Sequence, residues 1–158
     1  MAKQLGVPFG VLNAGVNAND FTHRTFQSGL VKKPAQGEPM KASLSDAINI
    51  QLPYNLERLL FYLTGQNHDQ IREWYQSLES EEGNFDLTTT THFWWTKLQN
   101  EFRSAKVSDT QLCETIKRVL KDYDYWMDPH TGVAFAAAEQ LGYIALSEKI
   151  TANAVAIM

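Results

Sequence analysis

The segment 128–132, with the sequence Asp-Pro-His-Thr-Gly, places an imidazole and a hydroxyl group next to each other. Its proline disfavours the helical region for Asp128, and the alanine-rich run 133–141 predicts a helix directly afterwards. His130 and Thr131 are therefore expected where a helix begins, where free backbone N–H groups and the helix dipole favour a phosphorylated or carboxylated ligand. The alternative interpretation is a helix cap, with Asp128 or Thr131 as N-cap and His130 as an ordinary loop residue.

A second polar cluster, made of Asn17, Asn19 and Asp20, follows the apolar run 7–16, which predicts a buried parallel strand. The aromatic run 123–127, directly before the histidine segment, is also typical of a strand. Ligands of open α/β sheets bind beyond the carboxyl ends of the strands, so two polar clusters in equivalent positions predict one shared site. The alternative is that these asparagine and aspartate side chains only bond to nearby backbone in a turn.

Several amphipathic segments would position these clusters. They predict helices at 21–27, 53–65, 69–78 and 93–102, and a further helix after a capping box formed by Ser108 and Gln111. Loops are expected at 31–43 and 80–91.

This order of elements predicts an α/β fold in three parts. Residues 1–52 form a strand, a helix and a loop of an α/β domain, 53–122 form a helical subdomain or insertion, and 123–158 return to the α/β domain as strand, helix and strand. Residues 1–6 are typical of the last turn of a helix, and 154–158 of a buried strand that no turn follows. We therefore expect the chain to be a piece of a larger structure.

Composition narrows the class of protein. The chain has 158 residues, 44% of them hydrophobic, which is the size and composition of one globular domain. A net charge of −4 argues against a nucleic-acid surface, and no apolar run is long enough for a membrane span. The single cysteine, Cys113, is typical of a reducing compartment, so a cytoplasmic location is expected. The four histidines are scattered, so no metal site is expected.

Four short motifs, in order along the chain, resemble those of threonine synthases. The segment 17–20 with Arg24 and Gly29 resembles their "NxND…R…G" pattern, and 43–50 resembles "TLSxAMDI" apart from Asp46 and Asn49. The segment 54–58 is similar to the "NxER" that follows, and 128–134 to "DPHTAVA". The tract "QLPYNLER" resembles the threonine-synthase-like branch found in eukaryotes.

This resemblance implies a fold-type-II pyridoxal-phosphate enzyme, related in fold to the tryptophan synthase β chain. A threonine synthase converts O-phosphohomoserine and water to threonine and phosphate, whereas the threonine-synthase-like branch is credited with eliminating phosphate to leave a 2-oxo acid and ammonia. The expected partner is therefore a small phosphorylated amino acid, and a homo-oligomer stays open.

The resemblance also implies roles for the matched residues. His130, Thr131 and Asp128 would lie at the cofactor. Substrate-binding roles would fall to six further residues: Asn17, Asn19, Asp20, Arg24, Ser43 and Ser45. No catalytic residue is expected, because the family's cofactor-binding lysine lies in an "FKD" segment upstream of "NxND" that this sequence does not contain. Its "TGNFG" and "TAHPAKF" segments would fall just outside the two ends, so the chain is expected to be inactive alone.

A non-catalytic function is the alternative. The chain would then be a stand-alone interaction protein derived from this enzyme fold, with its tryptophans available to a partner. These tryptophans are Trp74, Trp94, Trp95 and Trp126.

Overall fold

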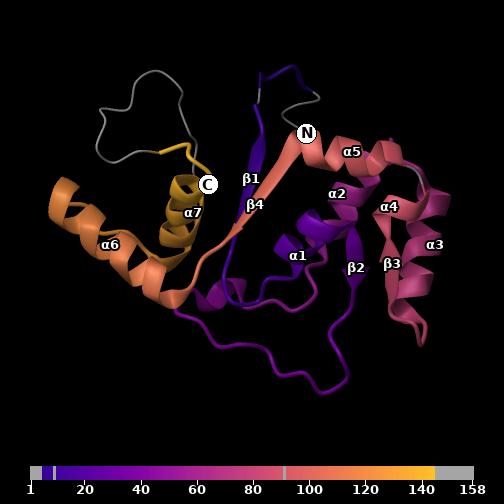
Figure 1. Cartoon of the computed structure of the whole chain (residues 1–158), viewed down its shortest axis with the longest axis horizontal. Helices are drawn as coiled ribbons and strands as arrows, with labels where there is room; N and C mark the ends of the chain where they lie inside the picture. Colours follow the sequence, from indigo (N-terminus) through magenta and orange to yellow (C-terminus); the bar gives the residue numbers. More distant parts are fainter. Residues whose placement is uncertain (1–4, 9, 91, 145–158) are drawn as a thin grey trace.

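Two separate pairs of short strands organise the chain (Figure 1). The computed structural model describes residues 5–8, 10–90 and 92–144. Strand β1 (Leu12–Val16) pairs in parallel with β4 (Phe102–Lys106), from Leu12 opposite Phe102 to Val16 opposite Lys106. Strand β2 (Leu30–Lys32) pairs antiparallel with β3 (Asn84–Asp86). The fold class is therefore mixed α/β, as the sequence predicts.

Helices lie on both sides of the β1–β4 pair. Helices α6 and α7 lie on one side, and α1 to α5 lie on the other side with the β2–β3 pair (Figure 1). Their bounds are α1 (Phe21–Ser28), α2 (Asn55–Leu63), α3 (His68–Glu79), α4 (Leu87–Thr90), α5 (His92–Glu101), α6 (Asp109–Tyr123) and α7 (Pro129–Gln140), with a 3₁₀ helix at Asp46–Ile48.

Local sequence signals explain where several helices begin and end. Ser108 and Gln111 form the predicted capping box at the start of α6. The Asn67 side chain accepts from the backbone N–H of Gln70 at the start of α3. Helix α1 ends at Gly29, whose φ of 78° is in the left-handed region that glycine adopts without strain.

The larger core lies among α1 to α5 and the β2–β3 pair. Leu60 and Leu63 on α2 are fully buried there, and Trp74 on α3 stacks on Phe85 of β3 with ring centroids 5.1 Å apart. The edge of Trp94 meets the same Trp74 ring at 5.2 Å. These aromatic contacts fix α3, β3 and α5 against one another.

A smaller core joins α6 and α7 to β4. Its buried members are short or branched side chains: Ala105, Val107, Leu112, Val133, Ala136 and Ala137. Two glycines allow α7 to pack closely against β1 and against α6. A Cβ added at Gly15 of β1 would lie 3.0 Å from the carbonyl oxygen of Val133, and one added at Gly132 would lie 2.5 Å from Leu112.

The structure corrects the predicted strands. Residues 124–128 form no strand, because Asp124 ends α6 in the left-handed conformation and an irregular turn leads into α7. The strand predicted at 7–16 is confirmed as parallel but covers only Leu12–Val16, and it is partly exposed because β4 is its one neighbour in the described chain. Residues 1–4 and 154–158, also assigned to elements above, lie outside the described residues.

The middle block is not purely helical. It contains β4, because α5 ends at Glu101 and Phe102 begins the strand that pairs with β1. The predicted loops at 31–43 and 80–91 likewise contribute β2, β3 and α4. The division at residues 52 and 122 remains a prediction, although β4 connects the middle block to the first part.

Candidate functional site

Asn17, at the carboxyl end of β1, holds the loop 41–49 in place. Its side chain is 2% exposed, and its Nδ2 lies 2.7 Å from Ser43 Oγ, 2.7 Å from Asn49 Oδ1 and 3.2 Å from the carbonyl oxygen of Ser45. Asn19 adds a donor to the Lys41 carbonyl at 2.8 Å and accepts from the Lys41 N–H at 2.9 Å. The two asparagines therefore fix a loop that has little regular structure of its own.

Ser45 connects that loop to the histidine segment. It is fully buried, and its Oγ lies 3.1 Å from Nδ1 of His130 on α7. The other ring nitrogen of His130, Nε2, is buried and has no hydrogen-bond partner among the described residues. The structure thus brings together three segments that the sequence singles out, around 17–20, 43–49 and 128–131.

The N-terminus of α7 is capped by the chain itself. Asp128 Oδ1 accepts from the N–H groups of His130 at 2.9 Å and Thr131 at 3.1 Å, and the Thr131 hydroxyl donates to the second carboxylate oxygen. The Thr131 hydroxyl and the two N–H groups lower the pKa of Asp128. Asp128 is therefore the N-cap, as the cap interpretation predicts, but His130 lies within α7 and is not a loop residue. The Asp128 carboxylate occupies the two N–H groups that the sequence leaves for an anionic ligand.

Asp20 forms ion pairs with two basic side chains at the same end of the β1–β4 pair. Its carboxylate lies 2.9 Å from Nε of Arg24 and 2.7 Å from Nζ of Lys106, the last residue of β4. Burial raises the pKa of Asp20, but the hydrogen bonds and charges of Lys106 and Arg24 outweigh burial and leave this pKa lowered. Arg24 is therefore paired within the chain and adds little free positive charge.

A hollow of about 380 Å³ opens between β1 and α7. It is lined by Asn13, Ala14, Gly15, Ile48, His130, Thr131, Val133 and Ala134. These described residues include no lysine and no carboxylate, so the hollow is a neutral surface with a few polar groups. His130 and Thr131 line this hollow, and Ser45 contacts a ring nitrogen of His130. The other residues that the sequence assigns to the site do not line it: Asn17, Asn19, Asp20, Arg24, Ser43 and Asp128.

Sequence reasoning missed three residues of this region. Asn13 lines the hollow, and a polar residue inside an apolar strand was the available signal. Asn49 is the acceptor that Asn17, Asn19 and Ser43 share. Lys106 lies too far along the chain for its pairing with Asp20 to be read from the sequence.

Two further observations concern metal binding and membrane insertion. Within the residues that the structure describes, no three His, Cys, Asp or Glu side chains come together as metal ligands would. None of the helices in the same residues is long and apolar enough to cross a membrane.

Several known proteins are similar to this chain in sequence. The threonine synthase of Pseudomonas aeruginosa is 31% identical over 140 residues, which is 89% of this chain and 28% of that protein. The yeast threonine synthase (Saccharomyces cerevisiae) is 32% identical over 153 residues, covering 89% of this chain and 28% of its own length. The human threonine synthase-like 2 protein is 32% identical over 134 residues, covering 85% and 26%. No known family profile matches the sequence.

Solved structures share the fold. The pyridoxal-phosphate-bound threonine synthase from Brucella melitensis superposes with a TM-score of 0.78 at 27% identity, over 88% of this chain and 28% of that one. The yeast threonine synthase gives a TM-score of 0.76 at 30% identity, over 89% and 29%. The chain spans little more than a quarter of the length of these relatives. In sequence and in fold, this chain is similar to one segment of the threonine synthases.

Proposed function

We propose that this chain forms one wall of the pyridoxal-phosphate site of a threonine synthase, which converts O-phosphohomoserine and water to threonine and phosphate. The observation that carries the proposal is the superposition of 88% of the chain on a threonine synthase with bound pyridoxal phosphate. The hollow between β1 and α7 supports it, because residues of two motifs shared with that family meet there or directly behind it.

A phospholyase reaction on a related phosphorylated amino acid is the close variant of this proposal. Identities of 32% to yeast threonine synthase and 32% to human threonine synthase-like 2 favour neither reaction. Both reactions expel phosphate, and they differ in whether water is then added to the product of elimination. A cytoplasmic location belongs to the same proposal.

The hollow fits the cofactor as a surface for binding and orientation. Bound pyridoxal phosphate would supply an electron sink for the reacting amino acid. His130 would orient the ligand, because its buried Nε2 lacks a partner in the described chain and its other ring nitrogen is held by Ser45. Thr131 and Asn13, which also line the hollow, would be further polar contacts for the ligand. Asp128 contributes by capping α7 and so fixing the position of His130.

Hydrogen bonds within the chain already engage the residues to which the family resemblance assigns substrate binding. Ser43 donates to Asn49 and Ser45 contacts His130, so these hydroxyl groups would have to leave their partners to bind a ligand phosphate. Asn17 and Asn19 are engaged with the same loop. We propose that these residues shape the site and that direct ligand contacts come from α7 and β1.

The covalent step would need a lysine from outside the described part of this chain. Lys97 lies 4.2 Å above the Tyr62 ring, and Lys106 is paired with Asp20. Neither lines the hollow. We propose that this chain by itself holds no cofactor-binding lysine and is inactive alone.

Titration with pyridoxal phosphate, followed by ¹H–¹⁵N NMR, tests the location of the site. Signals of Asn13, Gly15 and Thr131 should shift together and saturate. Signals of Ile71 and Leu78 on α3, in the other core, serve as the control and should not move. Shifts confined to α3, or no saturable shift at the hollow, would contradict the proposal.

Borohydride reduction with pyridoxal phosphate tests the lysine. Peptide mapping of the reduced protein should show low labelling spread over several exposed lysines. One lysine that is labelled to completion at equimolar cofactor would refute the claim that this chain lacks the covalent site.

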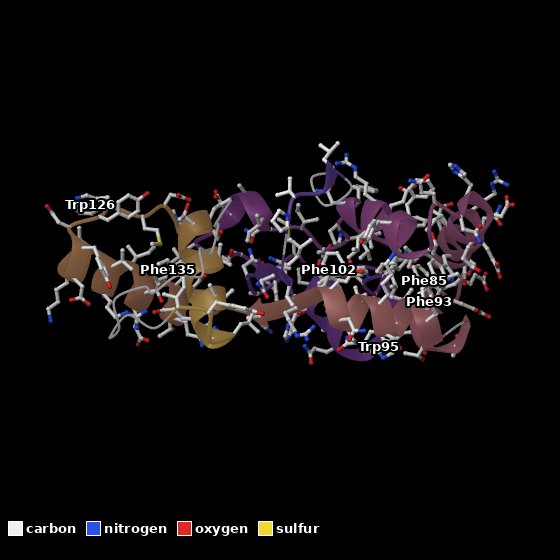
Figure 2. The ribbon with its side chains drawn as sticks, turned by 90° about the horizontal axis from the view of Figure 1, so that it is seen from above. Phe85, Phe93, Trp95, Phe102, Trp126 and Phe135 are labelled. Atoms are coloured by element: carbon white, nitrogen blue, oxygen red, sulfur yellow. The ribbon has the colours of Figure 1, made fainter. Side chains whose placement is uncertain are left out.

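An interaction function has one observation in its favour. Trp126 is 79% exposed, at one end of the molecule, with Tyr125 beside it in the turn between α6 and α7 (Figure 2). The other three tryptophans do not support this function, since Trp74 is buried and Trp94 and Trp95 pack against the larger core.

A further inference from the structure

The contact between Ser45 and His130 fixes more than the position of the imidazole ring. Ser45 is fully buried, and its hydroxyl has Nδ1 of His130, at 3.1 Å, as its hydrogen-bond partner in the described chain. A neutral imidazole carries one proton, so one ring nitrogen donates and the other accepts. The direction of this hydrogen bond therefore decides which nitrogen of His130 carries the proton.

Counting donors and acceptors separates the two directions. If Nδ1 donated to Ser45, the buried serine hydroxyl would have no acceptor and Nε2 would be an acceptor without a donor. If Ser45 donates to Nδ1, the hydroxyl is satisfied and a single group, the Nε2–H, is left without a partner in the described chain. Each buried unsatisfied donor or acceptor is costly, so the second arrangement is favoured.

Asn17 makes this arrangement possible by holding Ser45. Its Nδ2 lies 3.2 Å from the Ser45 carbonyl oxygen, and its contacts with Ser43 and Asn49 fix the residues on either side of Ser45. The Ser43 hydroxyl donates to Asn49 at 2.7 Å and so leaves its own oxygen free to accept from Asn17. Asn17 has no contact with His130 among those described, and acts on it through the loop.

We propose that Ser45 fixes His130 in the tautomer with the proton on Nε2, and that Asn17 is a positioning residue that holds Ser45 for this purpose. The consequence for a ligand, that His130 serves as a neutral hydrogen-bond donor to an oxygen acceptor, rests on the function proposed above. The tautomer itself is a property of this chain and is measured without any ligand.

Long-range ¹H–¹⁵N spectra of the ¹⁵N-labelled full chain measure the tautomer, at about pH 8.5 where an unperturbed imidazole is neutral. The His130→Gln variant assigns the His130 signals by their loss. In the unaltered protein, His130 Nδ1 should show the shift of an unprotonated nitrogen and Nε2 that of a protonated one. Ser45→Ala should lower the ratio of the two tautomers about fivefold, the equivalent of one ordinary hydrogen bond.

His23 is the matched control within the same spectra. Its Nδ1 lies 2.9 Å from Ser104 Oγ, so a second serine–histidine pair is present on α1 and β4. Ser45→Ala should leave the His23 signals unchanged, and Ser104→Ala should leave those of His130 unchanged. Asn17→Ala should change the His130 tautomer ratio in the same direction as Ser45→Ala. If that variant does not fold, Ser43→Ala removes just one of the Asn17 contacts and gives the same readout.

Two results would overturn the proposal. One is a proton on Nδ1 of His130 in the unaltered protein. The other is a His130 tautomer ratio that Ser45→Ala does not change while circular dichroism shows the variant to be folded. Failure of pyridoxal phosphate to bind would contradict the proposed function but would not alter either measurement.

Discussion

Replacing Gly15 with alanine would test the close contact between β1 and α7 on which the hollow depends. The new Cβ would lie 3.0 Å from the Val133 carbonyl oxygen, 3.1 Å from Ala137 Cβ and 3.3 Å from Ala134 Cα. All three atoms belong to α7, and two of them are backbone atoms. A rotamer change cannot relieve the contact, so the whole helix has to move by a few tenths of an ångström.

The expected cost follows from overpacking. Forcing an extra methyl group into a packed contact costs about 1–3 kcal/mol, since neighbouring groups leave their preferred positions. Replacing glycine also restricts the unfolded chain, which offsets about 0.4–1 kcal/mol of that cost. We therefore expect Gly15→Ala to lower the free energy of unfolding by about 1–2 kcal/mol. Since α7 carries His130, the contact with Ser45 should loosen as well.

Urea unfolding followed by circular dichroism measures this free energy. Gly10→Ala is the matched control, because a Cβ there would meet nothing within 4 Å. That variant should be as stable as the unaltered chain or slightly more stable. Equal stability of the Gly15 and Gly10 variants would refute the idea that α7 rests directly on β1.

Three further predictions follow from individual contacts. Asp20→Asn should lower stability at pH 7, because the pKa of Asp20 is lowered when folded. In urea unfolding this difference should shrink as the pH falls below 3.8, the ordinary value, and disappear once the pH is below the lowered pKa. A difference that does not shrink with falling pH would exclude the carboxylate charge as its cause. Thr131→Val should raise the pKa of Asp128 toward its ordinary value in an NMR titration, since the largest stabilising contact of the carboxylate is lost. Leu60→Ala, in the larger core, should cost about 2–5 kcal/mol by thermal unfolding, and a cost near zero would contradict its complete burial.

The sequence determined most of the helices by itself. The capping box at Ser108 and Gln111, the glycine at position 29 and the apolar stripe Leu56, Leu60 and Leu63 are local signals, and each one predicted an element that the structure contains. Local signals suffice there because a cap or a stripe involves residues within a few positions of one another. The N-cap at Asp128 is of the same kind.

Strand β4 was not predicted because its own sequence is ambiguous. Phe102 continues the apolar stripe of α5, and the Ser104 and Ala105 that follow have no strong preference for a strand. The segment becomes a strand by pairing with β1, about ninety positions earlier in the chain. The aromatic run 123–127 gives the opposite case. Its composition is typical of a strand, but no neighbouring strand pairs with it in the described chain.

The site divides in the same way. Residue types predicted that 17–20 and 128–131 carry polar chemistry, and the resemblance to one family added 43–50. Only the tertiary structure decided what each group does: Asp128 occupies the end of α7, Asn17 holds the loop, and Ser45 meets His130. Ser45 and His130 are 85 positions apart, and a hydrogen bond at 3.1 Å between them depends on how β1, the loop and α7 pack, which no local sequence signal contains.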